Sequence, residues 1–391
     1  MSGVALPLAG VKVVELARIL AGPWAGQILA DLGAEVVKVE APEGDETRRW
    51  GPPFVDNPDG SRDAAYFHSA NRGKRSVVAD FRVAEDIERV RGLIRDADVV
   101  IENFKVGGLA KYGLDYASLS ALKPELVYCS ITGFGQDGPY AHRAGYDFII
   151  QGLAGIMDLT GESDGPPEKI GVAFADVMTG LYAVIGIQAA LAQRGRTGRG
   201  AHVDMALLDV MVGVLANQAL NYLVSGRVPM RMGNAHPNLM PYGAYPVSDG
   251  WFILAVGSDA QFARLCKAVG LEWIAGDARF GTNAGRVAHR AALGPLIAGA
   301  TGRFTRADLL ATLEREGVPA GPINTVADAF ADPQVVHRDL KTVAAREDGI
   351  EVPGVRLPIR FVGQDWPVNP PSPALPEKST SPRRSPRRPL G

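Results

Sequence analysis

Cysteine is scarce in this 391-residue chain, which contains only Cys129 and Cys266. Two cysteines cannot form the disulfide framework of a small secreted protein. No group of cysteines and histidines has the spacing of a zinc site, so we expect no metal. The low cysteine content favours a reducing, cytoplasmic compartment.

An excess of charge of one sign is also missing. The 41 basic and 43 acidic residues give a formal net charge of −2. Such a balance provides no global field that would attract nucleic acid or an anionic membrane. No uninterrupted apolar run reaches about 18 residues, the length that predicts a membrane-spanning helix. The most apolar candidate, Val177–Leu191, contains interruptions and is interpreted as a buried helix.

Glycine, proline and hydrophobic residues are plentiful. The chain has 46 glycines and 28 prolines without a collagen-like period, and 46% of its residues are hydrophobic. This composition is typical of a globular enzyme with many turns. The length predicts two to three domains, at roughly 150 residues per domain.

Strand-like and helix-like segments alternate through the first half of the chain. This alternation predicts an α/β fold with a mostly parallel, doubly wound sheet, similar to a Rossmann domain. The expected strands are Val11–Leu16, Glu35–Glu40, Ser76–Asp80, Val99–Asn103, Leu126–Ile131 and His202–Ala206. The expected helices are Pro23–Leu32, Glu85–Asp96, Tyr116–Leu122, a long apolar helix from Asp176 to Arg194-Gly195, and Asp209–Val224.

A change in the sequence pattern near residue 225, where a loop rich in glycine, proline and asparagine begins, predicts a second, smaller α+β domain. We expect a strand at Trp251–Val256 and helices at Ala260–Val269 and Arg306–Glu316. The predicted boundaries are 1–224 for the first part of the large domain, 225–325 for the small domain and 326–369 for the return to the large one. Residues 370–391 are rich in proline, serine and arginine and are expected to be a disordered tail.

A glycine motif raises one alternative function. Gly133-Phe-Gly-Gln-Asp-Gly138 matches the dinucleotide fingerprint and follows a predicted strand. The fingerprint needs a helix N-terminus directed at the pyrophosphate, and it normally follows the first strand. The residues after Gly138 lack a helical apolar period, so nicotinamide binding is the weaker interpretation.

Several segments, in this order, resemble the class III coenzyme A transferase family, which includes formyl-CoA:oxalate and carnitine CoA-transferases. They are Pro7–Glu15, Ala21–Pro23, Asp31–Glu40, Asn71–Ser76, Glu102–Phe104, Gly133–Pro139, Phe174–Gly180, Arg194–Gly200 and Gly317–Pro322. The resemblance extends from about Leu6 to Pro370.

The resemblance implies covalent catalysis by Asp176. In the family an aspartate attacks an acyl-CoA thioester, forms a mixed anhydride, and then carries CoA as an aspartyl thioester to an acceptor carboxylate. A position at the start of an apolar helix favours an ionised nucleophile. On local sequence alone, an aspartate there is more typical of an N-cap, so both roles stay open.

The resemblance also implies that coenzyme A is the cosubstrate and that defined residues contact it. These are Leu20, Ala21, Lys74, Arg75, Asn103, Phe104, Lys105, Lys111 and Arg143. Cations and backbone donors suit the 3′-phosphate and diphosphate of CoA. Relatives commonly carry arginine where this chain has Lys105, which weakens a planar contact to phosphate. The terminus after residue 370 also departs from the family pattern.

Two alternatives compete with CoA transfer. The family's α-methylacyl-CoA racemases use a histidine in an Ala-Gly-His-Asp stretch, whereas this chain has Ala144-Gly-Tyr-Asp147. Tyrosine is a poor base at neutral pH, which disfavours the racemase. Asp147 is then expected to orient the anhydride or to position Asp176. The other alternative is a CoA-binding protein without catalysis.

A loop in the small domain is expected to contact the acyl substrates. Gly233, Asn234 and His236 occupy the place of a multi-glycine flap in some relatives. The form Gly-Asn-x-His-Pro is similar to members that use succinyl-CoA with C4–C5 dicarboxylates. His236 either binds an acceptor carboxylate or holds the loop. The resemblance further implies an interlocked homodimer.

Overall fold

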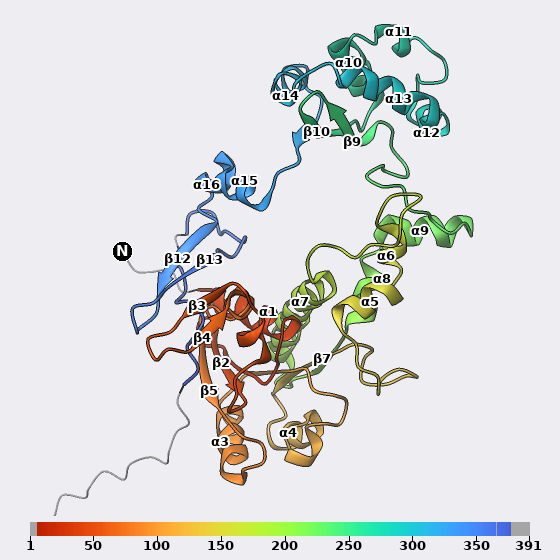
Figure 1. Cartoon of the computed structure of the whole chain (residues 1–391). Coiled ribbons are helices and arrows are strands. Elements are labelled where there is room, and N and C mark those ends of the chain that lie inside the picture. The colour runs from red at the N-terminus through yellow and green to blue at the C-terminus, as the bar shows by residue number, and fades with distance from the viewer. Residues whose placement is uncertain (1–5, 365, 377–391) are drawn as a thin grey trace, which may run out of the picture. The chain divides into compact units, whose positions relative to one another are not determined.

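The computed structural model describes residues 6–364 and 366–376. The chain divides into two compact units, which are described separately (Figure 1). Unit 1 comprises Met1–Ile156, Ile170–Ala219 and Pro333–Gly391, and unit 2 comprises Met157–Lys169 and Leu220–Asp332. We expected 157–169 in the large domain. It groups with unit 2, where Asp158 pairs with Arg231 and the Gly161 carbonyl accepts a hydrogen bond from Gly233 N.

Unit 1 is built on a six-stranded parallel sheet, which confirms the α/β class. Its strand order is β5-β2-β1-β6-β7-β8. The strands are β1 (Lys12–Glu15), β2 (Glu35–Glu40), β5 (Lys74–Val78), β6 (Val99–Glu102), β7 (Val127–Thr132) and β8 (His202–Ala206). Each predicted strand of the first half matches one of these within two residues at either end.

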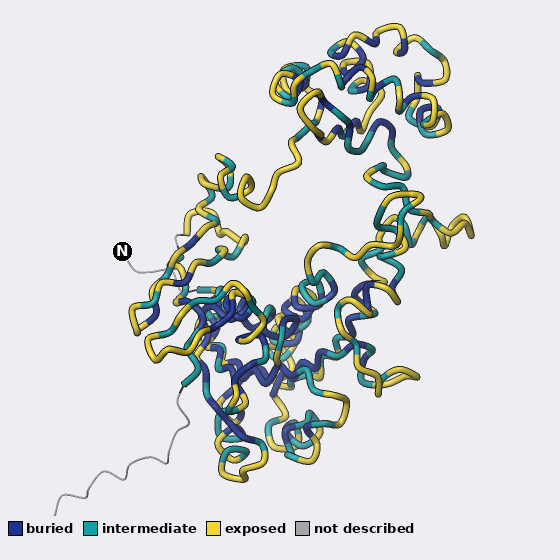
Figure 2. The backbone as a smooth tube through the Cα atoms, viewed as in Figure 1, coloured by how far each residue is buried: buried dark blue, intermediate teal, exposed yellow. Residues whose placement is uncertain are grey.

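Alternate residues of the strands enter two different cores. Val13 and Ile101 belong to one core, together with helices α1 (Ala21–Asp31) and α7 (Phe174–Thr197). Val14 and Tyr128 belong to the other, with helices α3 (Ala84–Arg95) and α4 (Tyr116–Leu122). The central strands, such as β6 and β7, are therefore buried on both faces, as their continuous apolar sequences predict, whereas the edge strand β8 is partly exposed (Figure 2).

Helix α7 is the longest helix of the described residues. By length and composition it is the one single helix of the described residues that is apolar enough to cross a membrane. The bent pair α8 (Leu207–Gly213) and α9 (Ala216–Ser225) passes the same test only when the two helices are taken together. Ala183 and Ile187 of α7 are fully buried, and the helix packs against α1, β7 and β8. These contacts are those of a core helix.

Two helix boundaries differ from the predicted ones. Helix α7 continues past Gly195 to Thr197 and ends at Gly198, whose φ of +69° permits the turn that bonds its N–H to the Arg194 carbonyl. The predicted helix Asp209–Val224 is two helices, α8 (Leu207–Gly213) and α9 (Ala216–Ser225). It is interrupted because Ala216 has a left-handed φ of +47°.

Smaller elements complete unit 1. They are η1 (Glu46–Arg49), β3 (Phe54–Asp56), β4 (Arg62–Ala64), α2 (Ala65–Ser69), η2 (Ala110–Tyr112), α5 (Asp147–Leu153), α16 (Pro333–His337), β12 (Lys341–Ala345) and β13 (Glu351–Val355). Helix α6 (Ile156–Leu159) spans the boundary between the units.

Residues 370–376 fall within the predicted tail but contact unit 1. The Pro370 carbonyl accepts a hydrogen bond from Gly73 N, and Ser372 Oγ bonds to His68 Nδ1. Ser372 is 1% exposed. Residues 370–376 are therefore ordered, contrary to our expectation, because these polar partners fix the segment. The rest of the predicted tail, 377–391, lies outside the described residues.

Unit 2 contains a three-stranded antiparallel sheet in the order β11-β10-β9. The strands are β9 (Tyr242–Val247), β10 (Gly250–Ala255) and β11 (Ala320–Pro322). The helices are α10 (Asp259–Val269), α11 (Glu272–Ala275), α12 (Asn283–Ala288), α13 (Arg290–Thr301), α14 (Arg306–Arg315) and α15 (Val326–Ala331). Phe252 and Leu309 lie in the centre of its separate core.

Candidate active site

The strand order creates a crevice at one edge of the parallel sheet. The chain proceeds from β1 to β2 on one side, whereas β6 pairs with β1 on the other. Ligands of open α/β sheets bind where the strand order reverses in this way, beyond the carboxyl ends of the strands. The loops after β1 and β6, 16–20 and 103–106, both lie at this point.

A cavity of about 190 Å³ is lined by these two loops and by residues of α5 and α7. It brings together eight of the predicted site residues, which are Leu20, Ala21, Asn103, Phe104, Lys105, Arg143, Asp147 and Asp176. These residues come from four separate stretches of the chain. The cavity also includes Arg18, Ile19 and Thr132, which sequence reasoning did not select because no motif marks them.

Asp176 lies in the first turn of α7 and is not its cap. The helix begins at Phe174, and the N-cap residue Ala173 provides no side-chain hydrogen bond. Instead Asp147 Oδ1 accepts hydrogen bonds from Ala175 N at 2.7 Å and from Asp176 N at 3.3 Å. The capping role that we weighed for Asp176 therefore belongs to Asp147.

Asp147 is fixed on its other oxygen as well. Gln151 Nε2 donates to Asp147 Oδ2 at 2.8 Å, and Gln151 Oε1 accepts a hydrogen bond from Ile170 N. Asp147 is the first residue of α5, so this carboxylate joins the starts of two helices. No side-chain hydrogen bond holds the Asp176 carboxylate within the described residues. It remains available to react.

The electrostatic environment makes Asp176 unusually basic for an aspartate. Burial, followed by repulsion from Asp147, raises its pKa from 3.8 to about 7. Burial, followed by the charges of Asp176, Asp147 and Asp45, raises the pKa of the nearby Tyr66 phenol to about 12. A carboxylate whose ionised form is destabilised is a stronger nucleophile and base than a solvated one.

Asn103 holds the two crevice loops together. Its Oδ1 accepts a hydrogen bond from Arg18 N at 2.9 Å, and its Nδ2 donates to the Arg18 carbonyl at 2.7 Å. The Arg18 side chain pairs with Glu46 at 3.0 Å and lies over the Phe104 ring. The oxygen and the nitrogen of the Asn103 side-chain amide are thus both engaged with the loop, so its contribution to the cavity is to set the shape of the wall.

Close backbone contact shapes the opposite wall. Gly133 and Gly145 approach so closely that a Cβ on either would lie 2.5 Å from the Cα of the other. Gly133 opens the motif that matches the dinucleotide fingerprint. No helix begins between Gly138 and Tyr146, so the helix N-terminus that a dinucleotide needs is missing from this described stretch.

A second cavity, of about 310 Å³, shares Arg18 and Phe104 with the first. It lies at the carboxyl ends of β1, β2 and β5. Phe81 stacks with Phe104 and also contacts Tyr112. Aromatic faces beside arginines suit a purine and its phosphates. Sequence reasoning missed Phe81, Arg82 and Tyr112, because aromatic residues scattered along a sequence give no motif.

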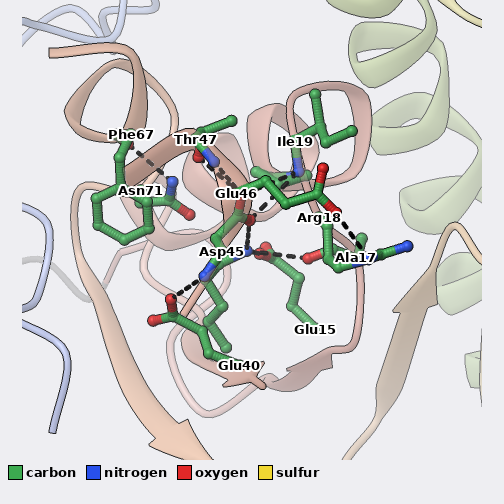
Figure 3. A network of polar contacts seen from close by, with 12 residues as sticks. Glu15, Ala17, Arg18, Ile19, Glu40, Asp45, Glu46, Thr47, Phe67 and Asn71 are labelled. Carbon is green, nitrogen blue, oxygen red and sulfur yellow. Dashed lines mark hydrogen bonds and ion pairs between the residues drawn. The ribbon is translucent and has the colours of Figure 1, made fainter. Parts of the chain in front are cut away.

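The structure places Lys74 in the core of unit 1 and not at either cavity (Figure 3 shows this region). Its ammonium donates to Glu15 Oε1 at 3.0 Å, to the Pro23 carbonyl at 2.8 Å and to Asn71 Oδ1 at 2.9 Å. All three of its protons are thereby engaged. Burial is the main reason why its pKa falls to about 8. Lys74 is a structural residue here and not a phosphate contact.

Two other predicted contacts also lie outside the cavities. Arg75 is exposed on β5, and its neighbours in the strand are buried. Lys111 belongs to η2 and lies 4.8 Å from the centre of the Tyr112 ring. Tyr112 lines the second cavity, so Lys111 is near that cavity without lining it.

The predicted substrate loop belongs to unit 2. Asn234 lines a cavity of about 570 Å³ together with Tyr242, Trp251 and Arg290. His236 N donates to the Tyr242 carbonyl, and its Nδ1 accepts a hydrogen bond from Asn238 N. Gly233 has a positive φ of +57° beside Glu162. His236 therefore holds the loop in shape.

No cluster of three metal-ligating side chains is present in residues 6–364 and 366–376.

Comparison with known proteins assigns the family. The family model described as CoA-transferase family III matches residues 8–379. The chain is 58% identical to a succinate–glutarate CoA-transferase of Agrobacterium fabrum, over 95% of this chain and 93% of that protein. It is 42% identical to the succinyl-CoA:glutarate CoA-transferase of Mus musculus, over 85% and 76% of the two chains. A crystal structure of a CAIB/BAIF family protein from Brucella suis has a TM-score of 0.86 at 62% identity, over 96% and 97% of the chains. The chain therefore belongs to CoA-transferase family III and is a CoA-transferase.

Proposed function

We propose that this enzyme transfers CoA from succinyl-CoA to a C4–C5 dicarboxylate through covalent intermediates on Asp176. The observation that carries the proposal is the Asp176 carboxylate, which lines the crevice cavity, accepts no side-chain hydrogen bond from the described residues and has a pKa raised to about 7. The substrate class is supported by the relatives, whose names specify succinate and glutarate.

The proposed reaction proceeds in four steps. An Asp176 oxygen attacks the thioester carbonyl carbon, the carbon–sulfur bond breaks, and CoA leaves as a thiolate. The thiolate attacks the aspartyl carbonyl of the resulting anhydride, which releases the donor acid and leaves CoA bound to Asp176 as a thioester. The acceptor carboxylate attacks this thioester and again frees the thiolate. Attack of the thiolate on the acceptor's acyl carbon then yields the new acyl-CoA and regenerates Asp176.

Asp147 positions Asp176 in this scheme. It carries the negative charge at the N-terminus of α7, where the helix dipole favours an anion. The CoA nucleotide occupies the aromatic second cavity, and the pantetheine extends along Arg18 and Asn103 into the first. In unit 2, loop Gly233–His236 stays a predicted contact for the acyl substrates.

A transfer assay tests the function directly. Purified protein is mixed with succinyl-CoA and glutarate, and glutaryl-CoA is measured by mass spectrometry. Formation of glutaryl-CoA supports the proposal. Epimerisation of a 2-methylacyl-CoA without transfer indicates the racemase, and CoA binding with neither reaction indicates a non-catalytic protein. The position of Tyr146, which is 62% exposed where the racemases carry histidine, disfavours the racemase.

The rate is expected to rise with pH through about 7. Only the ionised form of Asp176 attacks the thioester, and its pKa is raised to about 7. The value of kcat/KM for succinyl-CoA should increase about tenfold per pH unit below 6 and reach a plateau above 8. A profile that is flat between pH 5 and 8 contradicts this assignment.

Asp147→Asn provides the matched comparison for this profile. The substitution removes the charge that helps to raise the Asp176 pKa but keeps an oxygen that can accept the α7 hydrogen bonds. The midpoint of the pH profile should therefore shift to lower pH. It should stay above 4, because burial makes the larger contribution to the raised pKa.

We further propose a cytoplasmic homodimer of interlocked chains, with no metal. Support comes from exposed apolar side chains of unit 1 on α5 and α7, which a partner chain would cover. They are Phe148, Ile149, Leu181, Tyr182 and Ile185, each between 39% and 62% exposed. Light scattering after size-exclusion chromatography tests the assembly: a monomeric mass excludes it.

A further inference from the structure

One residue in the wall of the Asp176 cavity has an unusual backbone conformation. Ile19 has a φ of +68°, in the left-handed region that β-branched residues rarely adopt. Such a conformation persists only where the surrounding structure holds it, and such residues concentrate at functional sites. The groups that hold Ile19 therefore identify what shapes this wall.

Buried charges hold the loop from its inner side (Figure 3). Ile19 N lies 3.2 Å from Asp45 Oδ2 and 3.4 Å from Asp45 Oδ1, and donates its proton to this carboxylate. Lys38 Nζ donates to the Ala17 carbonyl at 2.9 Å and lies 2.9 Å from Asp45 Oδ2. The Lys38 and Asp45 side chains are both 0% exposed. The loop is thus attached to one ion pair at two points, the Ala17 carbonyl and the Ile19 N–H.

The ion pair is itself strongly fixed. Thr47 donates to Asp45 Oδ1 from its N at 3.0 Å and from its Oγ1 at 2.8 Å. Burial raises the pKa of Asp45, but Lys38 and the Thr47 hydrogen bonds outweigh it, so the pKa is lowered and the carboxylate stays ionised. Neither Asp45 nor Lys38 lines the cavity, whereas Arg18, Ile19, Leu20 and Ala21 do.

We propose that Asp45, together with Lys38, is a positioning residue for coenzyme A. The ionised pair keeps Ile19 in its left-handed turn and so presets the backbone from Arg18 to Ala21 for the cofactor. Asn103 fixes the same loop from the other side through Arg18. The inference rests on the proposed function only in that CoA occupies this cavity.

Titration calorimetry with CoA itself tests the proposal on the full chain. Asp45→Asn removes one of the two carboxylates that contact Lys38 and weakens the bond to Ile19 N. We expect the dissociation constant for CoA to rise about tenfold, the loss that follows when one charge-assisted hydrogen bond no longer holds the binding conformation. In the transfer assay KM for succinyl-CoA should rise similarly, while kcat should change less than about twofold because Asp176 is untouched.

Asp63→Asn is the matched control. Asp63 is also a buried aspartate, 4% exposed, and its Oδ1 lies 3.0 Å from Arg48 Nη1, but it has no contact with loop 17–20. Both substitutions should lower the melting temperature, and only Asp45→Asn should weaken CoA binding. An equal loss of CoA affinity in the two variants overturns the proposal.

Two changes at Ile19 separate loop shape from general stability. Glycine adopts positive φ without steric penalty, so adding Ile19→Gly to Asp45→Asn should restore part of the CoA affinity. Ile19→Pro alone leaves the ion pair intact, but it fixes φ near −65° and removes the N–H. This variant should therefore weaken CoA binding, and it tests the proposal even if Asp45→Asn does not fold. Unchanged affinity in Ile19→Pro overturns the proposal, as does a double variant that recovers nothing. A wild-type protein that binds CoA without transferring it contradicts only the proposed function.

Discussion

Asp176→Asn should reduce CoA transfer by at least about a thousandfold, the effect typical of removing a covalent nucleophile. Asparagine preserves the shape of the side chain, but its amide cannot form the anhydride. Glutaryl-CoA formation from succinyl-CoA is the measurement. Because the Asp176 carboxylate accepts no side-chain hydrogen bond in the described residues, the loss reflects chemistry and not a broken network. Transfer at more than a tenth of the wild-type rate contradicts the nucleophile assignment.

The same variant should be slightly more stable than the wild type above neutral pH. The folded protein raises the Asp176 pKa from 3.8 to about 7, so it disfavours the ionised form that predominates at pH 8. The folded state binds the proton more tightly than the unfolded state, and this group therefore reduces stability as the pH rises from about 4 to 7. A neutral asparagine avoids that loss of stability. The free energy of unfolding should therefore be greater by on the order of 1–2 kcal/mol, after allowance for solvent screening. Melting temperatures of the variant and the wild type at pH 5 and pH 8 measure this effect. A gain that is larger at pH 8 than at pH 5 reflects the missing charge, whereas a folding defect lowers the melting temperature at both pH values.

Glu15→Ala should produce the largest loss of stability, about 3–5 kcal/mol. Glu15 Oε1 lies 3.1 Å from Lys38 Nζ and Glu15 Oε2 lies 2.8 Å from Lys74 Nζ, and all three side chains are 0% exposed. The substitution leaves two buried ammonium groups without their shared partner. Urea unfolding at pH 7 measures the change.

A solvent-exposed ion pair provides the control for this substitution. Glu88 pairs with Arg91 on the surface of α3 and is 56% exposed. Glu88→Ala should change the free energy of unfolding by less than about 1 kcal/mol. A similar small effect for Glu15→Ala would show that the buried cluster does not stabilise unit 1.

The sequence predicted the parallel sheet for identifiable reasons, and several of the candidate site residues it selected lie together in one cavity. Apolar strands with turn residues between them are local signals, and all six strands were found. Asp147 and Asp176 were both predicted at the site, and they meet through backbone hydrogen bonds at the start of α7. The assignment of the cap to Asp147 was not predictable, because it depends on a contact between residues 28 positions apart.

Lys74 shows where sequence reasoning failed. The family resemblance implied a phosphate contact for Lys74, and its clustering with other candidate contacts after strands of an open α/β sheet favoured that role. Its partner Glu15 is 59 residues away and lies on a strand that is not its neighbour in the sheet. Nothing in the local pattern distinguishes an inward-pointing lysine from a surface one. Gly26 allows this burial, since a Cβ there would lie 1.9 Å from Glu15 Oε2.

The bonding of Asp147 has a consequence for the energy of the reaction cycle. Two carboxylates share one helix start in the resting enzyme, and their mutual repulsion raises the energy of that state. In the proposed mechanism, acylation of Asp176 converts one of them to a neutral anhydride and then to a neutral thioester, which ends the repulsion and leaves Asp147 alone at the positive end of the helix. The covalent intermediates are thereby brought closer in energy to the free enzyme. A reversible exchange between acids of similar thioester energy can then proceed without a large energy difference between successive states.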